Sequence, residues 1–132
     1  MTTAQHDVEL IVLKQAASYL ATPIFIVDLD GTLLFYNEPA ESILGRRYDE
    51  TGEMPMAEWG SAWTPTDDDG NPLDVNELPL AIAVSERRPA HGAMRIVGGD
   101  GAARRIEVTA FPLIGQSGRD LGSIAVFWED RS

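Results

Sequence analysis

Two aspartates, Asp28 and Asp30, follow an unbroken apolar run over residues 24–27 and precede Gly31. Two carboxylates this close together at the end of a strand could act as nucleophile and general acid/base in phosphoryl transfer. The same residues also suit a hairpin turn, because glycine supplies a positive φ and aspartate accepts hydrogen bonds from the nearby backbone. The elements around the turn must decide between the two interpretations.

The catalytic interpretation has a family parallel, since the residues Asp-Leu-Asp-Gly-Thr-Leu at 28–33 resemble the first motif of haloacid-dehalogenase-like phosphatases. That chemistry needs a parallel α/β sheet, a lysine that holds the phosphate, and a later acidic pair for magnesium. The only lysine, Lys14, precedes the motif, and the acidic run Asp67–Asp69 falls in an irregular loop. We therefore keep a phosphatase using Asp28 and Asp30 as the alternative function and expect no enzyme.

The elements that hold this turn follow from apolar periodicity and from turn residues. Two strands flank the turn too closely for a crossover, so they must pair antiparallel. Three further strands are joined by glycine-rich turns. Helices are expected over 5–20, 37–45 and 76–86, and strands over 24–28, 32–36, 92–97, 104–113 and 121–128. This order predicts an α+β fold, with helices on one face of a five-stranded antiparallel sheet and an amphipathic N-terminal helix.

Composition limits the possible functions. The 132 residues, 44% of them apolar, are enough for one domain with one core. A net charge of −11 opposes binding to nucleic acid or to an anionic membrane surface. The chain has no cysteine and no apolar run long enough to span a bilayer, so we expect a cytoplasmic protein.

Several short motifs occur in a characteristic order. They are the Asp28–Gly31 turn, Asn37 with Ala40, Glu41 and Gly45, the turn 69–72 followed by Glu77 and Pro79, the Gly101 hairpin, Pro112-Leu113, and Gly122 leading to Asp130. In order and spacing these residues resemble a PAS domain, the sensory and dimerisation module of many bacterial signalling proteins, over about Tyr19 to Asp130.

The resemblance implies a regulatory module that homodimerises and passes a signal to an effector domain or a partner protein. It divides the chain into an N-terminal helix over 1–20, a PAS domain over 21–130 and the start of a linker at 131–132. Asp130-Arg131-Ser132 looks like the Asp-x-Ser/Thr end that joins such a sheet to an output helix. The chain is then either a stand-alone module or a piece of a longer protein.

The resemblance also implies that the sheet face under the helix 76–86 is the ligand side. Counting along the strands and adding the nearby helix and aromatic residues gives a nearly all-apolar set. The candidate pocket residues are Phe25, Val27, Tyr36, Trp59, Trp63, Leu80, Val84, Met94, Ile96, Ile106, Val108, Ala110, Ile124, Val126 and Trp128. This set fits either a filled core or a cavity for a small apolar or aromatic ligand, and both stay open.

The same composition speaks against the polar cofactors of the family. A flavin needs amide side chains at its ring edge, and the light-sensing members add a cysteine. Haem needs an axial ligand, usually histidine, on or near the helix 76–86. The two histidines, His6 and His91, lie outside that helix. We expect neither flavin nor haem, and no metal.

The N-terminal helix carries more apolar surface than one stripe. Its candidate dimer-interface residues, Leu10, Leu13, Ala17 and Leu20, recur at the spacing of one helix face. Further apolar residues, such as Val8 and Ile11, widen that face. The surplus predicts a second partner, either the same helix of another subunit or a second surface within one molecule.

Overall fold

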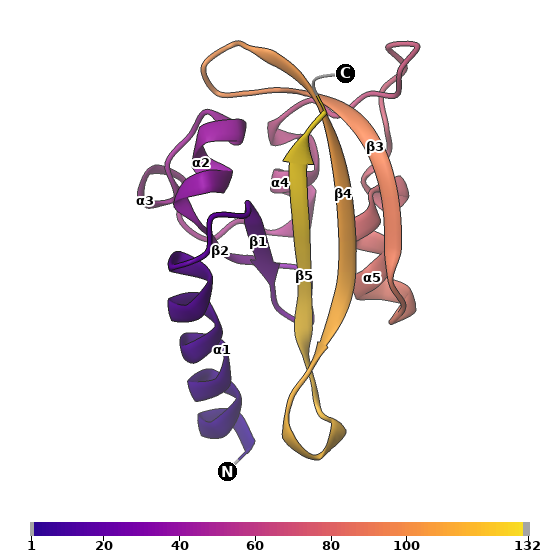
Figure 1. Ribbon diagram of the computed structural model, residues 1–132. Coiled ribbons are helices and arrows are strands. Elements are labelled where there is room, and N and C mark those ends of the chain that lie inside the picture. Colours follow the sequence, from indigo (N-terminus) through magenta and orange to yellow (C-terminus); the bar gives the residue numbers. More distant parts are fainter. Residues whose placement is uncertain (1, 131–132) are drawn as a thin grey trace.

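The computed structural model describes the backbone of residues 2–130 and the side chains of residues 8–130. Its centre is one sheet in the order β2-β1-β5-β4-β3, and every pair of neighbouring strands is antiparallel (Figure 1). The strands are β1 (Ile24–Val27), β2 (Leu33–Tyr36), β3 (Ala90–Val97), β4 (Ala103–Ile114) and β5 (Asp120–Glu129). The predicted α+β fold with a five-stranded antiparallel sheet is confirmed. Within these residues the sheet has none of the parallel pairing that the phosphatase alternative needs.

Five α-helices and two 3₁₀ turns surround the sheet in the described residues. They are α1 (Thr2–Ser18), α2 (Glu38–Leu44), α3 (Tyr48–Thr51), α4 (Met56–Ala62), α5 (Pro79–Glu86) and the turns Val75–Glu77 and Gln116–Gly118. The helix expected from residue 76 is two elements. Asp74 caps the 3₁₀ turn, and α5 begins afresh at Pro79, where the missing N–H of proline costs no helical hydrogen bond.

The helices form two layers. α2, α4 and α5 pack their buried residues into the main core on one face of the sheet. α1 lies against the other face, where Ala17 and Leu13 join a smaller cluster around Ile26. The sheet therefore buries apolar residues on both faces where α1 covers it.

Asn37 joins three of these elements. Its Oδ1 accepts hydrogen bonds from the N–H groups of Ile24 (3.0 Å) and Ala40 (3.2 Å), which holds β1 and caps α2. Its Nδ2 donates to the carbonyl oxygens of Ala17 (3.0 Å) and Thr22 (2.9 Å) at the end of α1. The side chain is fully buried, so this junction fixes how α1 enters the sheet.

β1 and β5 approach each other closely at Gly122. Its φ is +148°, and a Cβ atom there would lie 2.1 Å from the carbonyl oxygen of Val27. Only glycine fits this conformation and this contact. The residue thus allows β1 to sit between β2 and β5 and to present Phe25 to the core.

Candidate functional site

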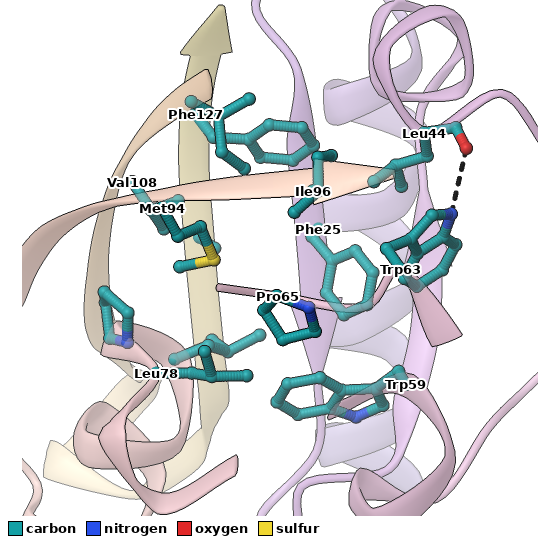
Figure 2. Close-up of a pocket in the computed structure, with 14 residues that line it drawn as sticks. Phe25, Leu44, Trp59, Trp63, Pro65, Leu78, Met94, Ile96, Val108 and Phe127 are labelled. Atoms are coloured by element: carbon teal, nitrogen blue, oxygen red, sulfur yellow. Dashed lines mark hydrogen bonds between the residues drawn. The ribbon is translucent and has the colours of Figure 1, made fainter. Parts of the chain in front are cut away.

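The main core contains a cavity of about 90 Å³ between the sheet and the helices α4 and α5 (Figure 2). Every strand of the sheet except β2 contributes to its wall. The residues that line it are Phe25, Leu44, Trp59, Trp63, Pro65, Leu78, Pro79, Leu80, Met94, Ile96, Ile106, Val108, Ala125 and Phe127. No charged, amide or hydroxyl side chain is among them.

The strand residues reach the cavity because side chains alternate along a strand. β3 sends Met94 and Ile96 to this face, and β4 sends Ile106 and Val108. The intervening residue Glu107 points to the opposite face, where its carboxylate meets the ring of His91. The alternation of apolar and polar residues along β4 is visible in the sequence, and it correctly predicts which alternate residues face the core.

Three aromatic rings form one side of the cavity, and Figure 2 shows them together opposite Met94 and Val108. The ring of Phe25 meets Trp59 at 5.6 Å and 71°, and Trp63 at 6.3 Å and 83°. These edge-on arrangements are the favoured geometry for aromatic pairs. The wall is therefore a packed aromatic unit.

The polar ends of both tryptophans are already bonded to the backbone. Nε1 of Trp59 donates to the carbonyl oxygen of Gly31 (2.7 Å), and Nε1 of Trp63 donates to that of Leu44 (2.9 Å). Neither indole N–H is left to hold a ligand. The Asp28–Gly31 turn thereby helps to position the wall, because one of its carbonyl groups anchors Trp59.

Tyr36 stands behind Phe25, with the two rings stacked at 5.8 Å and 3°. Its hydroxyl donates to the carbonyl oxygen of Arg46 at 3.0 Å. Burial raises the pKa of Tyr36, so the hydroxyl stays protonated as this donor. Tyr36 supports the wall without lining the cavity.

The structure divides the predicted pocket residues into groups. Phe25, Trp59, Trp63, Leu80, Met94, Ile96, Ile106 and Val108 line the cavity. Val27, Tyr36, Val84 and Ala110 are buried in the same core without lining it. Their role in binding a ligand stays a prediction.

The expected phase of the last strand is wrong. Ala125 and Phe127 face the cavity, whereas Ile124 and Val126 pack on the α1 side and Trp128 is 44% exposed. β5 is buried on both faces, so its apolar run carries no alternation that could reveal which residues point to which side.

Besides Ala125 and Phe127, four further lining residues were not predicted from the sequence: Leu44, Pro65, Leu78 and Pro79. They come from a helix end and from loops, where no periodicity indicates direction. Pro79 and Leu78 stand next to the predicted Leu80, which is the only signal that could have drawn attention to them.

Three of the four dimer-interface candidates need a correction as well. Leu10 and Ala17 are buried within the subunit, and Leu13 packs against the cluster on its own sheet. Leu20 follows α1 and is 51% exposed, so its place in an interface stays a prediction. The apolar residues that α1 turns to solvent are instead Val8, Ile11 and Val12.

Asp28 serves the hairpin turn. Its Oδ1 accepts hydrogen bonds from the N–H groups of Asp30 (2.9 Å) and Thr32 (3.0 Å). Its own N–H donates to the carbonyl oxygen of Thr32 at 3.0 Å. The carboxylate is thus engaged in the turn, as the structural interpretation predicts.

The lining residues lack the usual partners of a flavin or a haem. They offer no amide for a flavin ring edge and no histidine, cysteine or tyrosine for haem iron, and the thioether of Met94 is the one lining group that could ligate iron. His91 is exposed on the opposite face, with Nδ1 2.8 Å from Thr109 Oγ1 and Nε2 3.0 Å from Glu107 Oε1. The side chain of His6 lies outside the described residues.

Among the described residues, no three histidine, aspartate or glutamate side chains are grouped so that they could hold a metal ion. No helix within residues 2–130 has the length and apolar character that crossing a membrane requires.

A family model described as the PAS fold matches residues 13–131. The PAS domain of a protein from Colwellia psychrerythraea has a similar structure, with a TM-score of 0.64 at 20% identity, over 92% of this chain and 96% of that one. The PAS domain of Bordetella pertussis BvgS gives 0.65 at 16%, over 94% and 88%. The PAS domain of the nitrogen regulation protein NR(II) from Vibrio parahaemolyticus gives 0.61 at 17%, over 90% and 98%. No curated protein matches the chain.

Proposed function

This chain belongs to the PAS family, and from that membership we propose that it is a non-catalytic sensory or regulatory module of bacterial signal transduction. The observation that carries the proposal is the apolar cavity in the core, because a sensory module needs a place where a signal can enter. One similar structure is the PAS domain of a nitrogen regulation protein, which agrees with a regulatory role. A cytoplasmic setting is part of the proposal and rests on the absence of cysteine.

The ligand of this module is a small uncharged apolar molecule. A polar group that enters the cavity would lose its water and gain no hydrogen bond from the lining side chains. Apolar cavities of about 150 Å³ stay dry and bind benzene or xenon. The cavity of about 90 Å³ is smaller, so the ligand should be no larger than one small ring.

Three measurements on the purified protein test this ligand class. Mass spectrometry of the native protein and an absorption spectrum would detect a molecule that co-purifies. Titration with benzene should raise the midpoint of thermal unfolding, because a ligand that binds only the folded state stabilises it. Phenol is the matched probe, since it adds one hydroxyl to the same ring, and it should bind more weakly. Equal binding of both probes, or a co-purifying flavin or haem, would contradict the proposal.

The module acts as a homodimer that relays its signal to an effector domain or a partner protein. Support comes from the apolar residues that the fold leaves exposed on α1, where Val8, Ile11 and Val12 are between 57% and 60% exposed. Phe111 and Trp128 are also exposed, on β4 and β5. Light scattering over a range of concentrations tests the dimer, and a chain that stays monomeric when concentrated would refute it.

A further inference from the structure

Two arginines face each other on the neighbouring strands β3 and β4. Arg95 and Arg105 are directly paired in the register, and like charges in such a position destabilise a sheet. The carboxylate of Asp68 offsets this repulsion. Its Oδ1 lies 3.0 Å from Nε of Arg105 and 3.4 Å from Nε of Arg95, and its Oδ2 lies 3.3 Å from Nη2 of Arg105. Arg105 thus holds Asp68 through a two-bond fork.

Arg105 also holds the end of β5. Its remaining nitrogen, Nη1, donates to Oδ2 of Asp130 and, at 3.2 Å, to Oε2 of Glu107. The N–H of Asp130 donates in turn to the carbonyl oxygen of Arg105 at 2.8 Å. One guanidinium group therefore connects the loop residue Asp68 to Asp130. Figure 1 shows the loop between α4 and α5 rising to the same end of the molecule as the end of β5.

The segment that carries Asp68 also forms part of the cavity wall. We call residues 63–68 the edge segment, because its backbone pairs with the outer edge of β3. Thr66 and Arg95 exchange two backbone hydrogen bonds of 2.9 Å, and the N–H of Val97 donates to the carbonyl oxygen of Trp63 at 2.8 Å. Within the segment, Trp63 and Pro65 line the cavity.

We propose that the edge segment couples the cavity to the end of β5. A molecule in the cavity displaces Trp63 and Pro65, and the chain of contacts from Asp68 through Arg105 carries that displacement to Asp130. Asp130 directly follows β5, so its position sets the direction in which the chain leaves the sheet. The inference rests on the proposed function, in which the cavity is the entry point of the signal.

Nuclear magnetic resonance with dissolved xenon as the apolar probe tests the coupling. The amides of Leu80 and Met94 report whether xenon enters the cavity. The Asp130 amide and the Arg105 Nε–H report whether the far end responds. In the unmodified protein, xenon should shift all four resonances.

Asp68→Asn is the decisive variant. It should keep the xenon shifts at Leu80 and Met94 and lose most of the shift at Asp130. Asp69→Asn removes one charge from the same exposed turn and should leave all the shifts in place. An Asp130 shift that persists in Asp68→Asn, or that is absent from the unmodified protein while Leu80 and Met94 respond, overturns the coupling and leaves ligand binding intact.

A second experiment tests the coupling without a bound molecule. Leu80→Phe enlarges a lining side chain and should itself shift the Asp130 amide, and Asp68→Asn should cancel that shift. If xenon does not shift the Leu80 and Met94 resonances, the proposal of apolar ligand binding is wrong, and the Leu80→Phe experiment alone decides whether the coupling exists. The coupling is overturned if Leu80→Phe does not shift the Asp130 resonance. It is also overturned if the shift is equally large in the double variant Leu80→Phe, Asp68→Asn.

Discussion

Single polar residues determine how the elements of this protein meet. Asn37 is fully buried and connects α1, β1 and α2 through four hydrogen bonds. Asp28 closes the first hairpin, and the carbonyl group of Gly31 in the same turn anchors Trp59 of the cavity wall. None of these residues lines the cavity, so they affect the site only by positioning the elements that form it.

Asn37→Ala should lower the free energy of unfolding by about 3 kcal/mol. The change leaves the N–H groups of Ile24 and Ala40 without this partner, and each unsatisfied buried group costs roughly 1–3 kcal/mol. Urea unfolding followed by circular dichroism measures the loss. Asn76→Ala, at an exposed position, should stay within about 0.5 kcal/mol. Similar losses in both variants would show that the Asn37 junction does not stabilise the fold.

The pairing of Asp68 with Arg105 makes stability depend on pH in the acid range. The hydrogen bond from Arg105 holds the pKa of Asp68 below its usual value. A carboxyl group whose pKa is lowered in the folded state stabilises the fold above its unfolded pKa of about 3.9, and this contribution is lost as the pH falls through the lower folded pKa.

Asp68→Asn should therefore lose less stability than the unmodified protein when the pH falls below about 4. Thermal unfolding midpoints across that range measure the slope. Asp69→Asn is the matched control for one removed charge and should keep the slope of the unmodified protein. Parallel curves for all three proteins would exclude a stabilising role for the Asp68 pair.

At the scale of elements, α1 faces two environments. α1 turns Leu13 and Ala17 to its own sheet and leaves Val8, Ile11 and Val12 in solvent. It is also tied to the hairpin between β4 and β5, because Nη2 of Arg119 lies 2.6 Å from Oε1 of Glu9. The helix therefore belongs to the folded unit and still offers a free apolar side.

Matched substitutions separate the two sides of α1. Leu13→Glu should lower the free energy of unfolding by about 2 kcal/mol, because it places a charge against the apolar cluster on the sheet. Ile11→Glu, at a position 60% exposed, should change it by less than about 0.5 kcal/mol and should weaken the proposed dimer. Chemical unfolding and sedimentation equilibrium measure the two effects. If Ile11→Glu leaves association unchanged, α1 has no part in the interface.

At the scale of the whole molecule, the cavity is bounded by parts that lie far apart in the sequence. Phe25, Trp63, Leu80 and Phe127 come from four different elements or loops and meet only in the folded state. A change in any of these elements can alter the cavity. This architecture suits a module in which a small ligand affects distant surfaces.

Leu80→Phe should weaken benzene binding at least about tenfold, since the larger ring occupies part of the ligand volume. The variant should remain folded, because overpacking of this size typically costs about 1–3 kcal/mol. Ile114→Phe adds the same ring at a position 58% exposed and should leave benzene binding unchanged. Calorimetric titration measures both affinities. Equal affinity in the two variants would place the benzene site outside this cavity.

The sequence by itself determined the local features of this protein. The Asp28–Gly31 turn, the capping of α2 by Asn37 and Gly45, and the alternation along β4 follow from backbone preferences and from period-two burial. Their order also identified the fold. Each of these features depends on residues that are neighbours in the chain, which is why a pattern can reveal them.

Only the tertiary structure decided which side of each doubly buried element faces the cavity. The run over residues 124–128 is apolar throughout, so its phase depends on α1 covering one face of β5. Pro65 and Asp68 sit in a loop without periodicity, and they gain their places only through pairing with β3 and Arg105. These contacts join residues far apart in the chain, and local sequence preferences do not encode them.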